Sequence, residues 1–256
     1  MSKNIENFNE NFSYEDILLE YENTNKEQIK TILEKLDNLT LRRNISVEFI
    51  YSYNHCLESI LVYINDTGET ICIDNKDIEK LEEIKKDLDK YYGIYSSKLT
   101  LSTASIETHF NPNNKEILIG LKEQLIDFVI LNKHINTDNI LTSKQAINHL
   151  SLLLYHEYYH YLFDELKIGD SNLTYRDLLS RDEIYLKIIN KYRNEKLAWK
   201  FASEWSSVDI DKRALNAFIE TSMFSYSSYC KKALEEVNNP YSYFVNVMGV
   251  TIIIKD

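Results

Sequence analysis

The spacing of hydrophobic residues divides the chain into a first part where helices and strands alternate and a second part that is mostly helical. Apolar residues three or four positions apart predict amphipathic helices over residues 26–36 and 77–92, and Gly93 is suited to end the second one. A period of two predicts strands over residues 45–49, 60–64 and 70–73.

Turn-forming residues mark where the predicted strands reverse direction. The sequence Asn-Asp-Thr-Gly at residues 65–68 separates two of these strands and predicts a β-hairpin. Residues 111–114, which contain Pro112, separate two further predicted strands over residues 98–110 and 115–121. Ahead of all these elements, residues 14–21 predict a short helix within a weakly ordered N-terminal segment.

A long predicted helix lies in the middle of the chain. Residues 143–166 contain no Gly or Pro, and Thr142 with Gln145 three positions later has the pattern of a capping box. Residues 167–169, Lys-Ile-Gly, provide a basic last turn and a C-cap glycine. Apolar residues occur on nearly every side of this helix, which predicts that it is buried.

The rest of the chain predicts mainly further helices. We expect one helix over residues 182–205, two helices within residues 209–237, and a strand over residues 245–254. These elements together predict an α+β fold, with a small mixed β-sheet followed by a central buried helix and a helical C-terminal half.

No long linker or internal repeat separates these elements, so we expect a single domain. Residues 1–25 are expected to form a partly ordered tail, and residues 26–256 the domain itself. Within the domain, residues 26–121 form the helix and sheet part and residues 122–256 the mainly helical part.

Composition and charge narrow the functional classes. The net charge of −11 argues against a general nucleic-acid-binding protein, because such proteins rely on clustered Lys and Arg. The three cysteines, Cys56, Cys72 and Cys230, lack the CxxC spacing of a zinc site. Residues 1–15 show no secretory signal, and no apolar run reaches the roughly 20 residues that span a bilayer. We therefore expect a cytoplasmic protein that binds neither nucleic acid directly nor a membrane.

The buried helix carries candidate chemistry in an HExxH motif at residues 156–160. Residues four apart share one face of a helix, so His156 and His160 can both reach one zinc ion through Nε2 at about 2.0–2.1 Å. Glu157 can then act as a general base on a water molecule at the metal. His149 lies seven residues upstream on nearly the same face. We expect it to line a cleft at most, and otherwise to be a buried histidine satisfied by a backbone carbonyl.

A catalytic zinc site usually has a third protein ligand and an open position for water. Asp164 and Glu165 follow the motif too closely on the same helix to approach from the opposite side. The next predicted helix offers three candidate carboxylates, Glu183, Glu195 and Glu204. Glu195 is favoured because Ala198, three residues later, lets two helices approach closely, but spacing leaves the other two open.

The motif and the segment that follows it resemble a known family. HExxH followed some 35 residues later by ExxAxxFA, residues 195–202 here, is similar to the ImmA/IrrE group of short cytosolic gluzincin metallopeptidases. The resemblance covers roughly residues 100–205. It implies a zincin-like domain in which His156, His160 and Glu195 bind Zn²⁺ and Glu157 is the catalytic base.

The same resemblance carries implications for the substrate. It implies that the strand over residues 116–121 binds a peptide by pairing at the edge of the sheet. It also implies a cytoplasmic protein substrate, such as a helix-turn-helix transcriptional repressor encoded beside the peptidase in a mobile genetic element.

The proposed hydrolysis also needs a group that stabilises the oxyanion of the tetrahedral intermediate. Four residues of the helical half are candidates, and the sequence does not distinguish among them: Tyr192, Arg193, Tyr226 and Tyr229.

Three positions depart from the family pattern. Tyr159 stands where the family usually has Gly, and Trp199 stands where it has Asn or Asp, a partner for a metal-binding histidine. Asp164 replaces a His that is often present. The first two departures favour a different function, that of a catalytically impaired zincin-like protein that acts as a protein-interaction module.

Two further interpretations of the motif have less support in the sequence. Residues 157–160 also read ExxH, the helical unit of di-iron carboxylate bundles, but those bundles need a second ExxH and the sequence has none. The motif could instead be accidental within a buried helix. The capped helix and the matching ExxAxxFA segment argue against that explanation.

Overall fold

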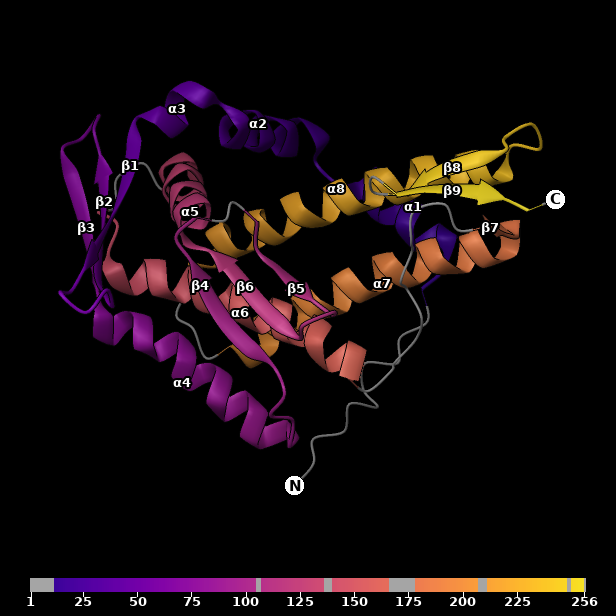
Figure 1. The fold of residues 1–256 in the computed structure, drawn as a ribbon. Coiled ribbons are helices and arrows are strands. Elements are labelled where there is room, and N and C mark those ends of the chain that lie inside the picture. Colours follow the sequence, from indigo (N-terminus) through magenta and orange to yellow (C-terminus); the bar gives the residue numbers. More distant parts are fainter. Residues whose placement is uncertain are drawn as a thin grey trace.

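The computed structural model describes residues 12–104, 107–135, 140–165, 178–206, 211–247 and 250–255. Within these residues it contains helices and small sheets (Figure 1). The helices are α1 (Tyr14–Asn23), α2 (Lys26–Asp37), α3 (Leu39–Arg43), α4 (Asn75–Tyr92), α5 (Leu121–Ile135), α6 (Ser143–Glu165), α7 (Arg181–Trp205) and α8 (Lys212–Asn238). The fold is therefore α+β, as the hydrophobic pattern predicts.

Within the described residues the strands form three separate three-stranded sheets, where the sequence predicts one mixed sheet. Along the chain they are β1 (Ile45–Tyr51), β2 (Leu57–Ile64), β3 (Glu69–Asp74), β4 (Lys98–Ser102), β5 (His109–Asn111), β6 (Glu116–Gly120), β7 (Leu178–Leu179), β8 (Phe244–Val247) and β9 (Val250–Ile254). The third sheet, β7-β9-β8, lies in the half that the sequence predicts to be mainly helical.

The first sheet follows the sequence prediction closely. Strands β1, β2 and β3 form an antiparallel meander, and Gly68 in the predicted turn has a left-handed φ of 67°. Ile60, Val62 and Ile64 alternate with more exposed neighbours and enter the core. Helix α4 then begins at the Asp74 cap and ends at Gly93, also left-handed, as predicted.

The second sheet corrects two predictions. Residues 98–110 are not one strand, because they form β4 and, after a connection, the short β5. The order is β4-β6-β5, with β4 parallel and β5 antiparallel to β6. The strand predicted at residues 116–121 is therefore the central strand β6, both of whose edges are already paired. It cannot accept a peptide by edge pairing, and this expectation from the family resemblance is wrong.

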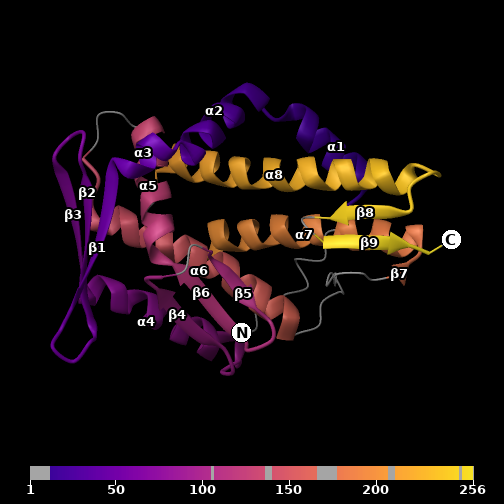
Figure 2. The ribbon, with the colours of Figure 1, turned by 45° about the horizontal axis from the view of Figure 1, so that its top comes forward.

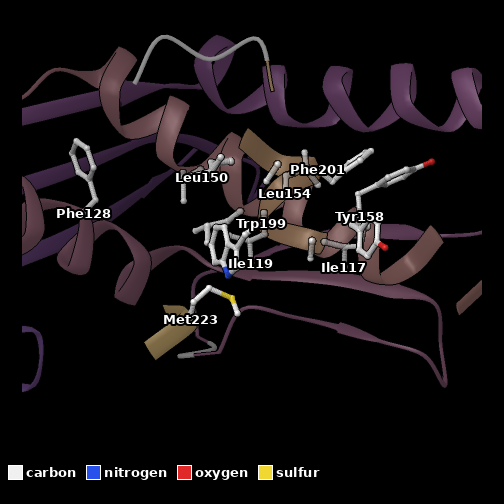
Figure 3. Packing of buried hydrophobic residues seen from close by; sticks show 14 of the residues in the cluster. Ile117, Ile119, Phe128, Leu150, Leu154, Tyr158, Trp199, Phe201 and Met223 are labelled. Atoms are coloured by element: carbon white, nitrogen blue, oxygen red, sulfur yellow. The ribbon is translucent and has the colours of Figure 1, made fainter. Parts of the chain in front are cut away.

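Helix α6, which carries the HExxH motif, is the centre of the molecule. It contacts α4, α5 and α7 together with β3, β5 and β6, and the second sheet lies across it (Figure 1). The predicted capping box is present: the backbone N–H of Gln145 donates to Thr142 Oγ1 at 3.3 Å, and the backbone N–H of Thr142 donates to Gln145 Oε1 at 2.9 Å. The predicted C-cap at Gly169 lies outside the described residues. Figure 3 shows Leu150, Leu154 and Tyr158 of this helix within the buried cluster that also contains Phe201 of α7.

Helices α7 and α8 lie side by side, and α1 and α2 pack along α8 (Figure 2). The two helices predicted within residues 209–237 are one continuous helix, α8, since that stretch contains no Gly or Pro to interrupt it. The strand predicted at residues 245–254 is instead the pair β8 and β9, which packs on α8.

The predicted N-terminal helix is confirmed as α1, and its Ile17 is fully buried in the main core. The first eleven residues of the predicted tail lie outside the described part of the chain. None of the described helices combines the length and the apolar character needed to cross a bilayer.

Candidate metal centre

The two motif histidines point at a common location. His156 and His160 are one turn apart on α6, and their Nε2 atoms lie 3.2 Å from each other. Two ligands of a tetrahedral zinc ion with bonds of about 2.0–2.1 Å are separated by about 3.3 Å. The spacing of the two nitrogens therefore matches that of two ligands on one ion.

Glu195 on α7 completes the cluster from the opposite side. Its Oε2 lies 3.4 Å from His156 Nε2, and its Oε1 lies 3.3 Å from His160 Nε2. One ligand atom from each of the three residues can be chosen so that all lie within 4.8 Å of one another. The structure thus brings together the three residues that the family resemblance implies as ligands.

The competing carboxylates on α7 have other surroundings. Glu183 closes a capping box at the start of the helix, where its Oε2 accepts from the backbone N–H of Ser180 at 2.8 Å. Glu204 is exposed near the end of the helix. Ala198 is fully buried in the core, in agreement with the predicted close approach of α6 and α7.

The electrostatics of the cluster favour a charged Glu195. Burial by itself raises the pKa of this carboxyl, but the His160 and His156 imidazoles outweigh burial and hold the pKa far below its ordinary value. Burial lowers the pKa of His160, and Glu195 more than offsets that effect, so the His160 pKa is raised. A buried carboxylate stabilised by two imidazoles is suited to share a cation with them.

Glu157 lies beside the cluster but is not part of it. Its Oε1 is 3.9 Å from His156 Nε2, and the carboxyl is buried. Burial raises its pKa, and the nearby Glu195 charge adds to the effect, while the two histidines and the backbone N–H of Phe110 act in the opposite direction. A raised carboxyl pKa suits a group that must accept and later release a proton near neutral pH. This arrangement agrees with the predicted base, whose role stays a prediction.

Of the residues considered for oxyanion stabilisation, Tyr226 on α8 lies beside the cluster of His156, His160 and Glu195. Its hydroxyl donates a hydrogen bond to the Glu195 carboxylate, and its pKa is raised by burial and then by the Glu195 charge. Tyr192 is buried, and its ring packs edge-on against Phe12 at 6.0 Å. Tyr229 is exposed. No sequence pattern singles out Tyr226, because its position depends on how α8 packs against α7.

The residues that depart from the family pattern occupy defined places. Tyr159 is buried and packs on Phe201 at 5.6 Å, so it fills the interface between α6 and α7. Trp199 is also buried, and its ring lies on that of His156 with a centroid distance of 4.0 Å. Asp164 is partly exposed near the end of α6.

His149 does not join the centre. It is buried between Phe128 and Phe218 and lines a small cavity of about 20 Å³, close to the size of one water molecule. Its Nε2 meets no hydrogen-bond partner within the described residues, so the expected backbone carbonyl is absent there. It is therefore a cavity-lining residue.

A buried His156, His160 and Glu195 group of this kind could hold a metal ion. The donor set of two imidazole nitrogens and one carboxylate fits zinc, with a position left open. Comparison with models of known protein families, with curated proteins and with solved structures finds no match for this chain. The function must therefore be argued from the site itself.

Proposed function

We propose that this chain is a zinc-dependent endopeptidase of the gluzincin type that hydrolyses a peptide bond in a protein substrate. The observation that carries the proposal is the convergence of His156, His160 and Glu195 from two helices, with Glu157 directly beside them. An accidental HExxH sequence has no reason to meet a buried carboxylate on another helix. The ExxAxxFA segment supplies that carboxylate, in keeping with the ImmA/IrrE resemblance.

In the proposed hydrolysis the metal ion, Glu157, Glu195 and Tyr226 each have a separate role. When bound, zinc acts as a Lewis acid that polarises the substrate carbonyl and brings the pKa of water to about 7. Glu157 accepts a proton from the attacking water and delivers it to the departing amine. Tyr226 holds the Glu195 carboxylate in place, and in turn Glu195 balances the charge of the ion.

The substrate we propose is an extended peptide bound along β5 rather than β6. Among the described strands β5 pairs only with β6, so its other edge has no strand partner, and the proposed peptide lies along that edge. The backbone N–H of Phe110, in the middle of β5, donates to Glu157. We propose that a peptide lying along this edge brings its scissile carbonyl next to that bond and to Glu157.

The identity of the substrate rests on the family resemblance alone. We propose a cytoplasmic protein, and a helix-turn-helix transcriptional repressor from the same mobile genetic element as the first one to test. Its cleavage, with the products identified by mass spectrometry, would give the position of the scissile bond. A substrate that the full chain leaves intact in the presence of zinc would direct the search to other proteins.

The test of the function is hydrolysis that depends on metal. Purified chain should cleave an unstructured protein or peptide library, lose the activity with a chelator, and regain it with added zinc. The Glu157→Gln variant should bind zinc as the parent does and lose hydrolysis. Activity that survives both the chelator and this substitution would contradict the proposal.

A second function is favoured by the aromatic residues around the centre. Tyr159 and Trp199 stand where the family has smaller or polar residues, and both are packed against the centre or its helices. We therefore keep a zincin-like interaction module as the second candidate. A stable complex with a partner, formed with zinc bound and without cleavage, would support it over the peptidase.

A further inference from the structure

The second ring nitrogen of His156 has an unusual environment. Nε2 faces His160 and Glu195, while Nδ1 is buried and finds no hydrogen-bond partner among the described residues. Metal-binding histidines almost always donate this other N–H to a carboxylate, carbonyl or water, which fixes the orientation of the ring. A contact with the face of the ring can also fix its orientation.

Trp199 provides that contact. The two ring centroids are 4.0 Å apart with the planes inclined by 37°, so the indole covers one face of the imidazole. Trp199 is one turn beyond Glu195 on α7. The same helix face thus supplies a proposed ligand and the surface on which another ligand rests.

Trp199 is itself held in place by α8. Its Nε1–H donates to Ser222 Oγ at 3.1 Å, and Phe218 meets the indole edge-on at 5.2 Å with an interplanar angle of 87°. In Figure 3 the indole nitrogen points toward the segment that carries Met223, the neighbour of Ser222. A buried indole with its N–H bonded and its ring packed is a rigid support.

The contacts of α8 with α7 repeat at one-turn intervals. Phe218, Ser222 and Tyr226 follow each other four residues apart on α8. The first two hold Trp199, and the third donates to Glu195. One stripe of α8 therefore supports both the carboxylate and the indole.

We propose that Trp199 is a positioning residue that orients His156 for metal binding, with its aromatic face taking the role of the hydrogen bond that Nδ1–H does not donate to any described residue. The negative face of the indole also favours an imidazole that gains positive charge when it coordinates a cation. This inference rests on the proposed function only in that the centre binds a metal ion, since it does not require hydrolysis.

The experiment compares substitutions that keep or remove the aromatic face. Zinc affinity of the full chain is measured by competition with a chromophoric chelator for Trp199→Phe, Trp199→Leu and the control Trp205→Leu. Trp205 packs on Phe201 and Tyr92, away from the histidines. We expect Trp199→Leu to weaken zinc binding by at least about tenfold, as for loss of an outer partner, and Trp199→Phe to weaken it much less. The Trp205 control should bind zinc as the parent does.

Equal zinc affinities for the Phe and Leu variants would overturn the inference, because packing alone would then explain Trp199. Circular dichroism and thermal unfolding of the metal-free variants show whether each one folds. If Trp199→Leu does not fold, Ser222→Ala takes its place: it removes the hydrogen-bond acceptor of the indole and should also weaken zinc binding. Unchanged affinity in that variant would contradict the inference.

A second readout uses the fact that the chain has only two tryptophans. In a Trp205→Phe variant all tryptophan emission comes from Trp199, and zinc titration should change it with the midpoint found by chelator competition. In Trp199→Phe the emission of Trp205 should not respond to zinc. Emission of Trp199 that is indifferent to bound zinc would overturn the inference while leaving the peptidase proposal intact. A parent chain that binds no zinc would overturn both, and zinc binding without hydrolysis would contradict only the peptidase.

Discussion

Two buried histidines on α6, seven residues apart, have very different surroundings. His156 and His149 are both almost fully buried, and each packs against aromatic rings. Nε2 of His156 meets a second imidazole and a carboxylate, whereas Nε2 of His149 meets no partner within the described residues. Both histidines lie on nearly the same face of α6. Their surroundings differ because α7 places the Glu195 carboxylate beside His156.

The comparison shows what turns a buried histidine into a candidate ligand. Burial lowers the pKa of His149 to about 4, because nothing compensates the loss of water. Glu195 reverses that effect at the motif, where the pKa of His160 is raised. A carboxylate from a second helix is thus the feature that distinguishes the motif histidines from His149. Substitutions of Glu195 and of His149 can test this difference.

The largest expected effect is on catalysis, through Glu157. Replacing it with Gln keeps the size and the hydrogen-bonding capacity of the side chain but removes the proton acceptor. We expect hydrolysis to fall by about 10²–10⁴-fold, the usual contribution of a general base, with zinc content unchanged. Glu204→Gln, an exposed position on α7, is the matched control and should retain activity. Loss of zinc in Glu157→Gln would instead identify Glu157 as a ligand.

The next effect is on the metal itself, through Glu195. Glu195→Ala should weaken zinc binding by more than about a hundredfold, beyond the range for residues that only support a ligand. His149→Gln should leave zinc binding unchanged, although it too removes a buried polar side chain of the α6 region. Equilibrium dialysis measures both. Similar losses in the two variants would show that the convergence at Glu195 has no special role.

His149 predicts a pH dependence of the free energy of unfolding, because burial lowers the pKa of its imidazole. Its pKa is about 4 in the folded chain and 6.5 ordinarily, so the unfolded chain binds more protons between these values. The contribution of His149 to the free energy of unfolding is therefore fully present above pH 6.5. It is lost as the pH falls toward 4, and the loss is on the order of 3 kcal/mol. Urea unfolding of parent and His149→Gln at several pH values checks this. A difference between the two that does not vary with pH would contradict it.

The smallest effect is expected from Tyr226→Phe, which removes one hydrogen bond to Glu195. A hydrogen bond to a charged group contributes about 1.5–3 kcal/mol, so zinc affinity should fall by roughly tenfold to a hundredfold, less than in Glu195→Ala. Tyr229→Phe, an exposed tyrosine on the same helix, is the control. Equal zinc affinities of these two variants would show that Tyr226 does not support the metal-binding residues.

Local features of the fold and the motif can be predicted from the sequence. Hydrophobic periods predict α2, α4 and the first sheet, and the Thr142 capping box places the start of α6, because these depend on neighbours within a few residues. The segment around Glu195 favours it over Glu183, and the structure explains the choice: Glu183 caps its own helix.

What the sequence could not provide depends on packing between distant elements. The position of β6 between β4 and β5 follows from the pairing order, which no single strand encodes. Tyr226 could not be distinguished among 19 tyrosines, because its contact with Glu195 depends on the register of α8 on α7. Trp199 can be recognised from the sequence as a difference from the ImmA/IrrE pattern, but its stacking on His156 depends on how α7 packs against α6.

The most direct test of the central claim is X-ray absorption at the zinc edge, combined with elemental analysis of the purified full chain. We predict one zinc ion per chain with two imidazole nitrogens and oxygen ligands at about 2.0–2.2 Å. Absence of zinc, or sulfur ligands at about 2.3 Å, would show that the paired histidines and Glu195 do not form the metal site.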